Sequence, residues 1–438
     1  MRLFSNNMIS KEFYLTSLIA ALPISFIAGN MIININLLLI IVSSLFIFKE
    51  KIFQMKYYFL DKLFILFFVL ILITGLLNSH NLTSNNLIKD DFFNTSIKSF
   101  LFIKYLFFYI ILRFLVEKRI IKLKLFFVSC SIASLFVSFD IFFQFFYGED
   151  VLGFQGVQGK LSGPFGDELI AGGYLQRFSL FTFFTIPIFY SNSLTKYLKY
   201  LVPALLIIFF IGIILSGNRM PLLLFLLAVS LIVIFQKQTR KYFLHFAIIS
   251  TLLFLLIFNL NPKVKTNFQS FYAQVSQMTS ILINSDFKNE KPPPYFREFA
   301  TFYDTWLMRK YIGGGIKNFR YYCHMRPNKI KNSDIVCNMH PHNYYLEILT
   351  ETGLVGITII LSAFLILVYL TLYKKYFTKT SLCQNKIIVP FIFLFIVEIF
   401  PLKSTGSFFT TGNTTYLFLI LGILVGLMRR DILIENKN

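Results

Sequence analysis

The stretch Met339-His-Pro-His-Asn-Tyr-Tyr-Leu-Glu-Ile-Leu-Thr-Glu-Thr-Gly-Leu-Val-Gly356 joins the long polar segment of this chain to an apolar run. Repeated apolar runs lie on both sides of that polar segment, so this junction marks where an aqueous layer meets a membrane. Two histidines and an asparagine gather at the foot of the run. Titratable groups at such a boundary indicate chemistry on a substrate carried by a lipid.

The composition is that of a membrane protein. Of 438 residues, 56% are hydrophobic and 14% are charged, whereas a soluble domain is nearer to 25% charged. A run of about 18 or more apolar residues is long enough to span a bilayer. The sequence therefore predicts an all-α polytopic membrane protein with about twelve spans. These are expected near 13–29, 31–48, 63–77, 99–116, 125–147, 169–190, 200–215, 220–235, 242–259, 353–373, 387–402 and 414–428.

The net charge of +21 would fit a partner such as nucleic acid, but its distribution favours a topological explanation. If the N-terminus lies on the cytoplasmic side, most basic residues outside the long loop fall in the cytoplasmic segments between the spans. The short outer loops hold only Lys89, Lys98, Lys160, Arg219 and Lys403. This asymmetry is the positive-inside pattern of membrane proteins, from which long outer loops are exempt.

The chain divides into three parts on this topology. Residues 1–259 hold helices one to nine, residues 260–352 form one large outer loop domain with Arg297 and His342, and residues 353–438 hold helices ten to twelve and a cytoplasmic tail. The loop begins at Asn261-Pro262, where the preceding helix must stop.

Inside the loop domain, apolar residues recur at helical spacing over 295–309, after a run of three prolines. They predict an amphipathic helix with Arg297, Thr301 and Asp304 on another face. Gly313-Gly314-Gly315 then predicts a turn.

Cys323 and Cys337 both fall in the outer segment, and on the outer side of a bacterial inner membrane a disulfide between them is expected. Closing a loop of about 15 residues contributes roughly 3 kcal/mol in the chain-entropy model. Two free thiols remain the alternative.

His340, His342 and Asn343 allow two interpretations. In the structural one, Asn343 caps a helix that starts at Tyr344, Gly353 breaks it, and the histidines are ordinary interfacial residues. In the functional one, a histidine removes a proton from an acceptor hydroxyl, because imidazole is the natural base near neutral pH. The residues alone do not decide between His340 and His342.

Arg219 lies in Leu215-Ser-Gly-Asn-Arg-Met-Pro221, at the outer edge between two helices. An arginine there either snorkels to the interface or binds an anion, and its planar fork suits a phosphate better than an ammonium does. Arg297, on the polar face of the predicted loop helix, is either a solvated charge or a partner of Asp304.

The run His342–Gly356 resembles the hallmark of the O-antigen ligase and O-antigen polymerase superfamily. Leu161-Ser-Gly-Pro-Phe165, Ser216-Gly-Asn-Arg219 and the segment from Arg297 to Phe319 agree with it, as do the helix count and the position of the outer loop. Asn218 departs from the small residue usual there. The resemblance covers most of residues 60–430.

This resemblance implies a metal-independent, inverting glycosyltransferase of the C type, without a cofactor, in the bacterial inner membrane. Such enzymes take a glycan from undecaprenyl pyrophosphate on the periplasmic side. The essential histidine falls on His342, supported by His340 and Asn343, and the two pyrophosphate-contacting arginines fall on Arg219 and Arg297. Arg309, Arg320 and Arg326 are alternatives for the second arginine.

Three functions follow from this resemblance and from the spans. A ligase, which moves the glycan to a lipid A-core sugar in lipopolysaccharide biosynthesis, ranks slightly ahead of a polysaccharide polymerase, because the large loop and the three residues fit ligases better. A non-enzymatic transporter of the lipid-linked glycan ranks last, because charges within the spans are sparse. They are Lys104, Arg113, Asp140, Arg177 and Glu398.

Overall fold

The computed structural model describes residues 10–84, 92–157, 160–189, 191–235, 240–284, 294–326, 337, 340, 342–377, 387–404 and 406–435. Within these ranges the chain is built of helices and has no β-strand. Two isolated β-bridges, Glu149–Gln155 and Val157–Lys160, lie in the connection between α7 and α8. The predicted all-α class is therefore confirmed.

The helices fall into a bundle and a small group outside it. The bundle is formed by α1 Lys11–Ala20, α2 Leu22–Ala28, α3 Asn30–Phe48, α4 Phe59–Ser84, α5 Phe92–Phe102, α6 Lys104–Glu117, α7 Leu123–Tyr147, α8 Ala171–Phe189, α9 Ser191–Leu215, α10 Arg219–Phe235, α11 Arg240–Leu260, α15 Tyr344–Val368, α16 Ile388–Glu398 and α17 Thr411–Glu435. Outside it lie α12 Pro262–Asn284, α13 Pro294–Leu307 and α14 Phe319–Tyr322. A π-helical turn, Tyr369–Phe377, extends α15.

Six helices of the described chain are long and apolar enough to cross a membrane, and eight are if each of two bent pairs counts as one span. Three shorter apolar helices lie at Tyr200–Leu215, Arg219–Phe235 and Ile388–Glu398. The chain thus has the repeated apolar helices of a polytopic membrane protein.

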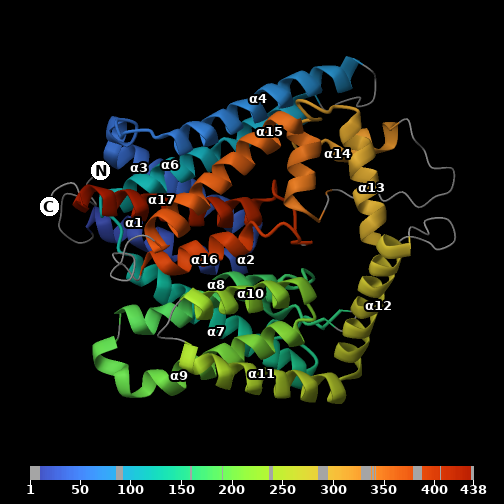
Figure 1. Ribbon diagram of the computed structural model, residues 1–438. Coiled ribbons are helices and arrows are strands. Elements are labelled where there is room, and N and C mark those ends of the chain that lie inside the picture. The colour runs from blue at the N-terminus through green and yellow to red at the C-terminus, as the bar shows by residue number, and fades with distance from the viewer. Residues whose placement is uncertain are drawn as a thin grey trace.

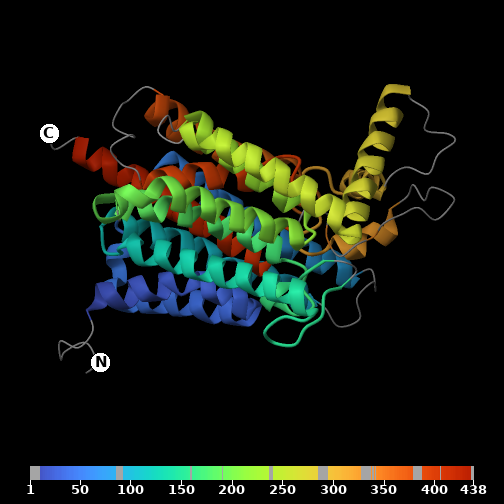
Figure 2. The same ribbon diagram turned by 90° about the horizontal axis from the view of Figure 1, so that it is seen from below.

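The bundle helices run side by side, and the two ends of the chain lie at the same end of the bundle (Figure 1). The group α12 to α14 lies at the opposite end, which we call the distal end. Figure 2 shows α12 turning away from α11, and the chain bends by 106° between the two helices. The side chain of Asn261 accepts from Lys263 N at 3.0 Å, and Pro262 opens the new helix, as proline does at a first helical position. The predicted stop at Asn261-Pro262 is confirmed, whereas α12 itself was not predicted.

Two glycines let α17 approach α6 closely. A Cβ on Gly422 would lie 2.8 Å from Leu112 Cβ, and one on Gly426 would lie 2.7 Å from Val116 Cβ. Small residues spaced in this way allow membrane helices to pack backbone against backbone. The helix α17 is therefore largely buried by its neighbours, and its apolar residues from Tyr416 to Met428 belong to the hydrophobic core.

Arg113, a charge within a predicted span, is paired. Its Nη1 lies 2.6 Å from Asp61 Oδ2, and Tyr109 donates to Asp61 Oδ1 at 2.6 Å. Buried charges persist when they are paired, so this ion pair helps to hold α4 and α6 together.

Candidate functional site

The helix α15 begins at the sequence hallmark. Asn343 has extended backbone, and its Oδ1 accepts from Tyr345 N at 2.9 Å and Leu346 N at 3.2 Å. The predicted cap is confirmed. The helix therefore starts directly after His342, earlier than the span expected at 353–373, because a side-chain oxygen satisfies its first amides.

The two imidazoles lie together, with ring centroids 5.3 Å apart and planes at 74°. Both histidines are half-buried. Burial lowers the pKa of His340, and the nearby His342 and Lys317 lower it further, so His340 is neutral near pH 7. Within the described residues, His342 makes no hydrogen bond, which leaves its ring nitrogens available to a substrate.

Gly353 interrupts α15 with a left-handed backbone, φ 67°. The break frees backbone groups that hydrogen-bond to the glycine turn of the outer segment. The bonds are Gly314 N to Thr350 O at 3.0 Å, Gly315 N to Glu351 O at 2.8 Å, Leu354 N to Lys310 O at 2.9 Å and Val355 N to Tyr311 O at 3.1 Å. The predicted break and the predicted turn thus form one joint, which binds the outer segment to α15.

This joint explains why glycines stand on both sides of it. A Cβ on Gly353 would lie 2.2 Å from Tyr311 O, and a Cβ on Gly313 would lie 2.3 Å from the backbone carbon of Glu351. Both positions also have positive φ, where residues with a side chain are strained. Only glycine fits at either place.

Arg219 follows a tight turn between α9 and α10. Gly217 has φ 70°, and Asn218 Nδ2 donates to Ser216 Oγ at 3.1 Å. A Cβ on Gly217 would lie 2.8 Å from Lys160 Cγ, so the turn lies against the start of the segment 160–165. Two stretches that carry the sequence resemblance are therefore neighbours in space.

The Arg219 side chain is half-buried and contacts α12. Its guanidinium lies 5.5 Å from the centre of the Phe271 ring. Its Nη1 is buried and has no hydrogen-bond partner among the described residues. A buried charged donor without a partner is costly, and a bound anion would relieve that cost.

The first turns of α8 connect the Arg219 turn with the start of α15. A Cβ on Gly172 would lie 2.4 Å from Ser216 Oγ, which shows how closely α8 meets the Arg219 turn. Five residues later, Arg177 Nη2 donates to Tyr344 OH at 3.3 Å. Five helical residues rise by about 7.5 Å, so the turn before Arg219 and the cap after His342 lie along the same short stretch of α8.

The helix predicted over 295–309 is present as α13. The face that carries most of its apolar residues, however, is not the face that packs against the rest of the protein. Thr301, Phe302 and Thr305 are buried, whereas Phe299 is 40% and Tyr303 is 55% exposed. Phe302 stacks on Phe319 at 3.8 Å, and this stack lies beside Cys323. Packing against that small cluster and α15 therefore decides which face is buried.

Cys323 and Cys337 form a disulfide with their Cα atoms 5.8 Å apart, as the sequence predicts. Cys323 is buried. The bridge attaches the chain shortly before His340 to the core of the outer segment, and it leaves Cys130 as the free, buried cysteine of the described residues.

Arg297 lies on α13 and is half-buried. Arg320 and Arg326, two of the alternatives for the second arginine, contact nearby residues. Arg320 Nε donates to Lys317 O at 3.2 Å, and Arg326 is 3% exposed with its Nη1 3.9 Å from Cys323 Sγ.

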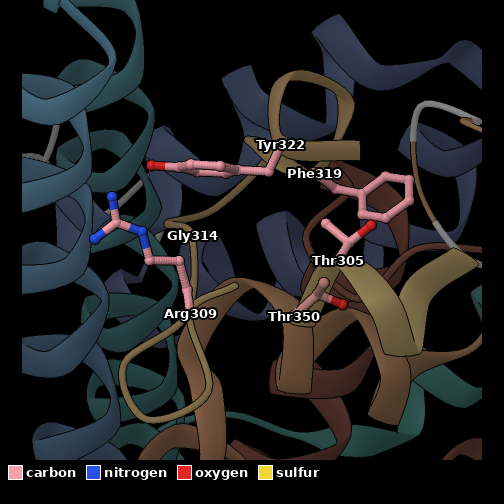
Figure 3. Close-up of a pocket in the computed structure, with 6 residues that line it drawn as sticks. All are labelled: Thr305, Arg309, Gly314, Phe319, Tyr322 and Thr350. Atoms are coloured by element: carbon pink, nitrogen blue, oxygen red, sulfur yellow. The ribbon is translucent and has the colours of Figure 1, made fainter. Parts of the chain in front are cut away.

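Arg309 lines a small pocket with Thr305, Gly314, Phe319, Tyr322 and Thr350 (Figure 3). Its guanidinium lies 5.7 Å from the centre of the Tyr322 ring. Tyr322 in turn donates to Asn78 Oδ1 at 2.8 Å, so Arg309 helps to fasten the outer segment to α4.

Sequence reasoning missed one buried polar cluster at the site. In the sequence, Arg177 and Glu398 are two of the sparse charges within the predicted spans, and Lys403 is a charge of a short outer loop. In the structure all three meet beside Tyr344. Burial lowers the pKa of Lys403 to about 7, although the carboxylate of Glu398 opposes this shift. The sequence does contain a signal for this cluster, because charged residues of opposite sign within apolar helices usually pair with each other or belong to a functional site.

Residues 204–361 match the family model described as O-antigen ligase. Over this region the chain is similar to the O-antigen ligases. The match confirms the resemblance to the O-antigen ligase and polymerase superfamily, and it spans Arg219, Arg297 and His342. No curated protein matches the chain. Together with the apolar helices, the match supports a multi-pass membrane protein related to this superfamily.

Proposed function

We propose that the protein is a membrane glycosyltransferase that moves a glycan from undecaprenyl pyrophosphate to a sugar of lipid A-core. One observation carries the proposal: the Nη1 of Arg219 is buried and has no hydrogen-bond partner among the residues that the structure describes. The Asn343 cap, directly after His342, lies along the same short stretch of α8 as the turn before Arg219. Arg219 would bind the pyrophosphate leaving group of the donor, and His342, near the same helix, would act as the base.

The proposed reaction is a single displacement with inversion. The acceptor hydroxyl oxygen attacks the anomeric carbon of the glycan, the bond from that carbon to the pyrophosphate oxygen breaks, and His342 takes the hydroxyl proton. Arg219 and Arg297 neutralise the charge that develops on the departing undecaprenyl pyrophosphate. A positioned base contributes typically about 10²–10⁴-fold, and the leaving group needs charge neutralisation, so no metal is required.

The proposed topology places the distal end on the periplasmic side of the inner membrane. The shorter helices α9, α10 and α16, together with α8, would complete the twelve crossings that the sequence predicts. In this arrangement residues 1–259 hold the first nine crossings, residues 260–352 form the periplasmic loop domain, and residues 353–438 hold the last three.

A transporter is less well supported than an enzyme. Arg113 pairs with Asp61, and Arg177 pairs with Glu398, so these charges are engaged within the protein. Transport of a charged lipid-linked glycan would favour unengaged charges along a central cavity.

The test uses the purified protein in nanodiscs with undecaprenyl-pyrophosphate oligosaccharide and lipid A-core, with products resolved on a gel. We expect glycan on lipid A-core with the wild type and none with His342→Ala, at equal insertion of the two proteins. Near-normal product with His342→Ala would refute the assignment.

Two further outcomes of the same assay are informative. Longer glycans that remain on undecaprenyl pyrophosphate would make the protein a polymerase of the same superfamily. His340→Ala is the matched comparison, and a greater loss there than with His342→Ala would move the role of base to His340.

A further inference from the structure

A buried ion cluster lies directly behind the His342 segment. Glu398, at the end of α16, is fully buried. Its Oε1 accepts from Arg177 Nη2 at 2.8 Å and from Lys403 Nζ at 2.6 Å. The cluster joins α8 to the connection between α16 and α17.

Tyr344 is the member of this cluster that belongs to α15. Its hydroxyl donates to Glu398 Oε1 at 2.7 Å and accepts from Lys403 Nζ at 3.1 Å and Arg177 Nη2 at 3.3 Å. One donor and two acceptor positions are all that a phenol has, so the hydroxyl is fully used. The ring also packs edge-on against Phe408, with centroids 5.6 Å apart. Both ends of the side chain are therefore held.

The residues on either side of Tyr344 are tied to the same connection. Asn343 Nδ2 donates to Pro401 O at 2.8 Å, and Tyr345 OH donates to Ile399 O. Three consecutive residues after His342 thus bond to residues 398–403. The backbone that carries the imidazole has little freedom to move on this side.

A stability role alone is a weak explanation for this arrangement. Buried ion pairs often add little to stability compared with apolar residues of similar volume, because their desolvation is costly. They do impose one geometry on the groups they join. A base must be held to within about 0.5 Å of its working position, and an error of about 1 Å can cost roughly 10²-fold in rate.

We infer that Tyr344, held by Arg177, Glu398 and Lys403, is a positioning residue that sets the His342 imidazole against the acceptor hydroxyl. The inference rests on the proposed function, in which His342 is the base. Tyr344 touches neither the substrate nor the reacting atoms; it acts through the backbone of residues 342–344.

The test is Tyr344→Phe in nanodiscs, with turnover of undecaprenyl-pyrophosphate oligosaccharide and binding of undecaprenyl pyrophosphate measured on the same preparation. The ring and its contact with Phe408 remain, and only the hydroxyl is lost. We expect kcat to fall about tenfold or more, while the Kd and the number of sites for undecaprenyl pyrophosphate stay within about twofold of the wild type. A positioning residue affects the rate of transfer more than donor binding.

Tyr416→Phe is the matched control. Tyr416 is also buried, its hydroxyl donates to Arg177 O at 3.2 Å, and its ring centre lies 4.9 Å from the Arg177 guanidinium. It lies on α17 and is not one of the residues bonded to 343–345. We expect its kcat to match the wild type.

Normal kcat in Tyr344→Phe would overturn the inference. Equal losses in both variants, with fewer donor sites, would also overturn it, because the cluster would then serve folding alone. His342→Ala is measured in parallel: if that variant transfers glycan, the proposed function itself fails, whatever Tyr344→Phe does.

Discussion

Replacing Gly353 by alanine tests the joint between α15 and the outer segment. The new Cβ would lie 2.2 Å from Tyr311 O, 2.3 Å from the Tyr311 carbonyl carbon and 2.5 Å from Ile312 N. All three are backbone atoms that cannot turn aside as the end of a side chain can. Ordinary contact begins near 3.4 Å, so the two segments would have to separate by about 1.2 Å, the difference between 3.4 and 2.2 Å.

The energetic cost follows from the bonds across that joint. Four backbone hydrogen bonds of 2.8–3.1 Å cross it, and each contributes about 0.5–1.5 kcal/mol net. Losing all four would cost roughly 2–6 kcal/mol. Left-handed backbone, φ 67° at this position, adds roughly 1–2 kcal/mol for a residue with a Cβ. We therefore expect Gly353→Ala to lower the free energy of unfolding by about 3 kcal/mol or more.

The assay is the midpoint of thermal unfolding in detergent, followed by size-exclusion chromatography, together with glycan transfer in nanodiscs. Gly412→Ala is the control, because its Cβ would meet only Phe26 Cε1 at 3.8 Å. We expect the control to unfold at or slightly above the wild-type midpoint, since alanine favours a helix, and Gly353→Ala to unfold several degrees lower and lose most transfer. Equal midpoints and equal transfer for the two variants would refute this account of the joint.

Two other substitutions address the arginine and the disulfide. Arg219→Lys keeps the charge but loses the guanidinium fork, so we expect transfer to fall at least tenfold in the gel assay, with insertion unchanged; unchanged turnover would mean that Arg219 only snorkels. Cys323→Ser with Cys337→Ser opens a loop of about 15 residues and is expected to lower the free energy of unfolding by roughly 3 kcal/mol, measured as a lower thermal midpoint. A midpoint equal to that of Cys130→Ser, the free-cysteine control, would contradict this.

Features set by local chemistry or by repeated patterns could be predicted from the sequence. The membrane class follows from the repeated apolar runs, because a bilayer imposes their length. The helix stop at Asn261-Pro262 follows from the steric effect of proline on its predecessor, and the Asn343 cap from an oxygen placed before the first helical turn. The disulfide follows from two cysteines in one outer segment. Each depends on residues close together in the chain.

Other features depended on contacts between distant parts of the chain. The buried stripe of α13 was not the most apolar one, because the partner surface around Phe319 and Cys323 decided it. A glycine is needed at position 353 because the backbone of Lys310–Gly315, which is distant in sequence, hydrogen-bonds to the helix break there.

What the sequence by itself determined, then, is the membrane class, the main helices, the cap after His342 and the candidate residues. Only the tertiary structure decided that Arg177 and Glu398, 221 positions apart, meet behind Tyr344, and that Gly172 joins this region to the turn before Arg219. The physical reason is that a charge within an apolar helix must find a partner, but no local pattern specifies which helix supplies it.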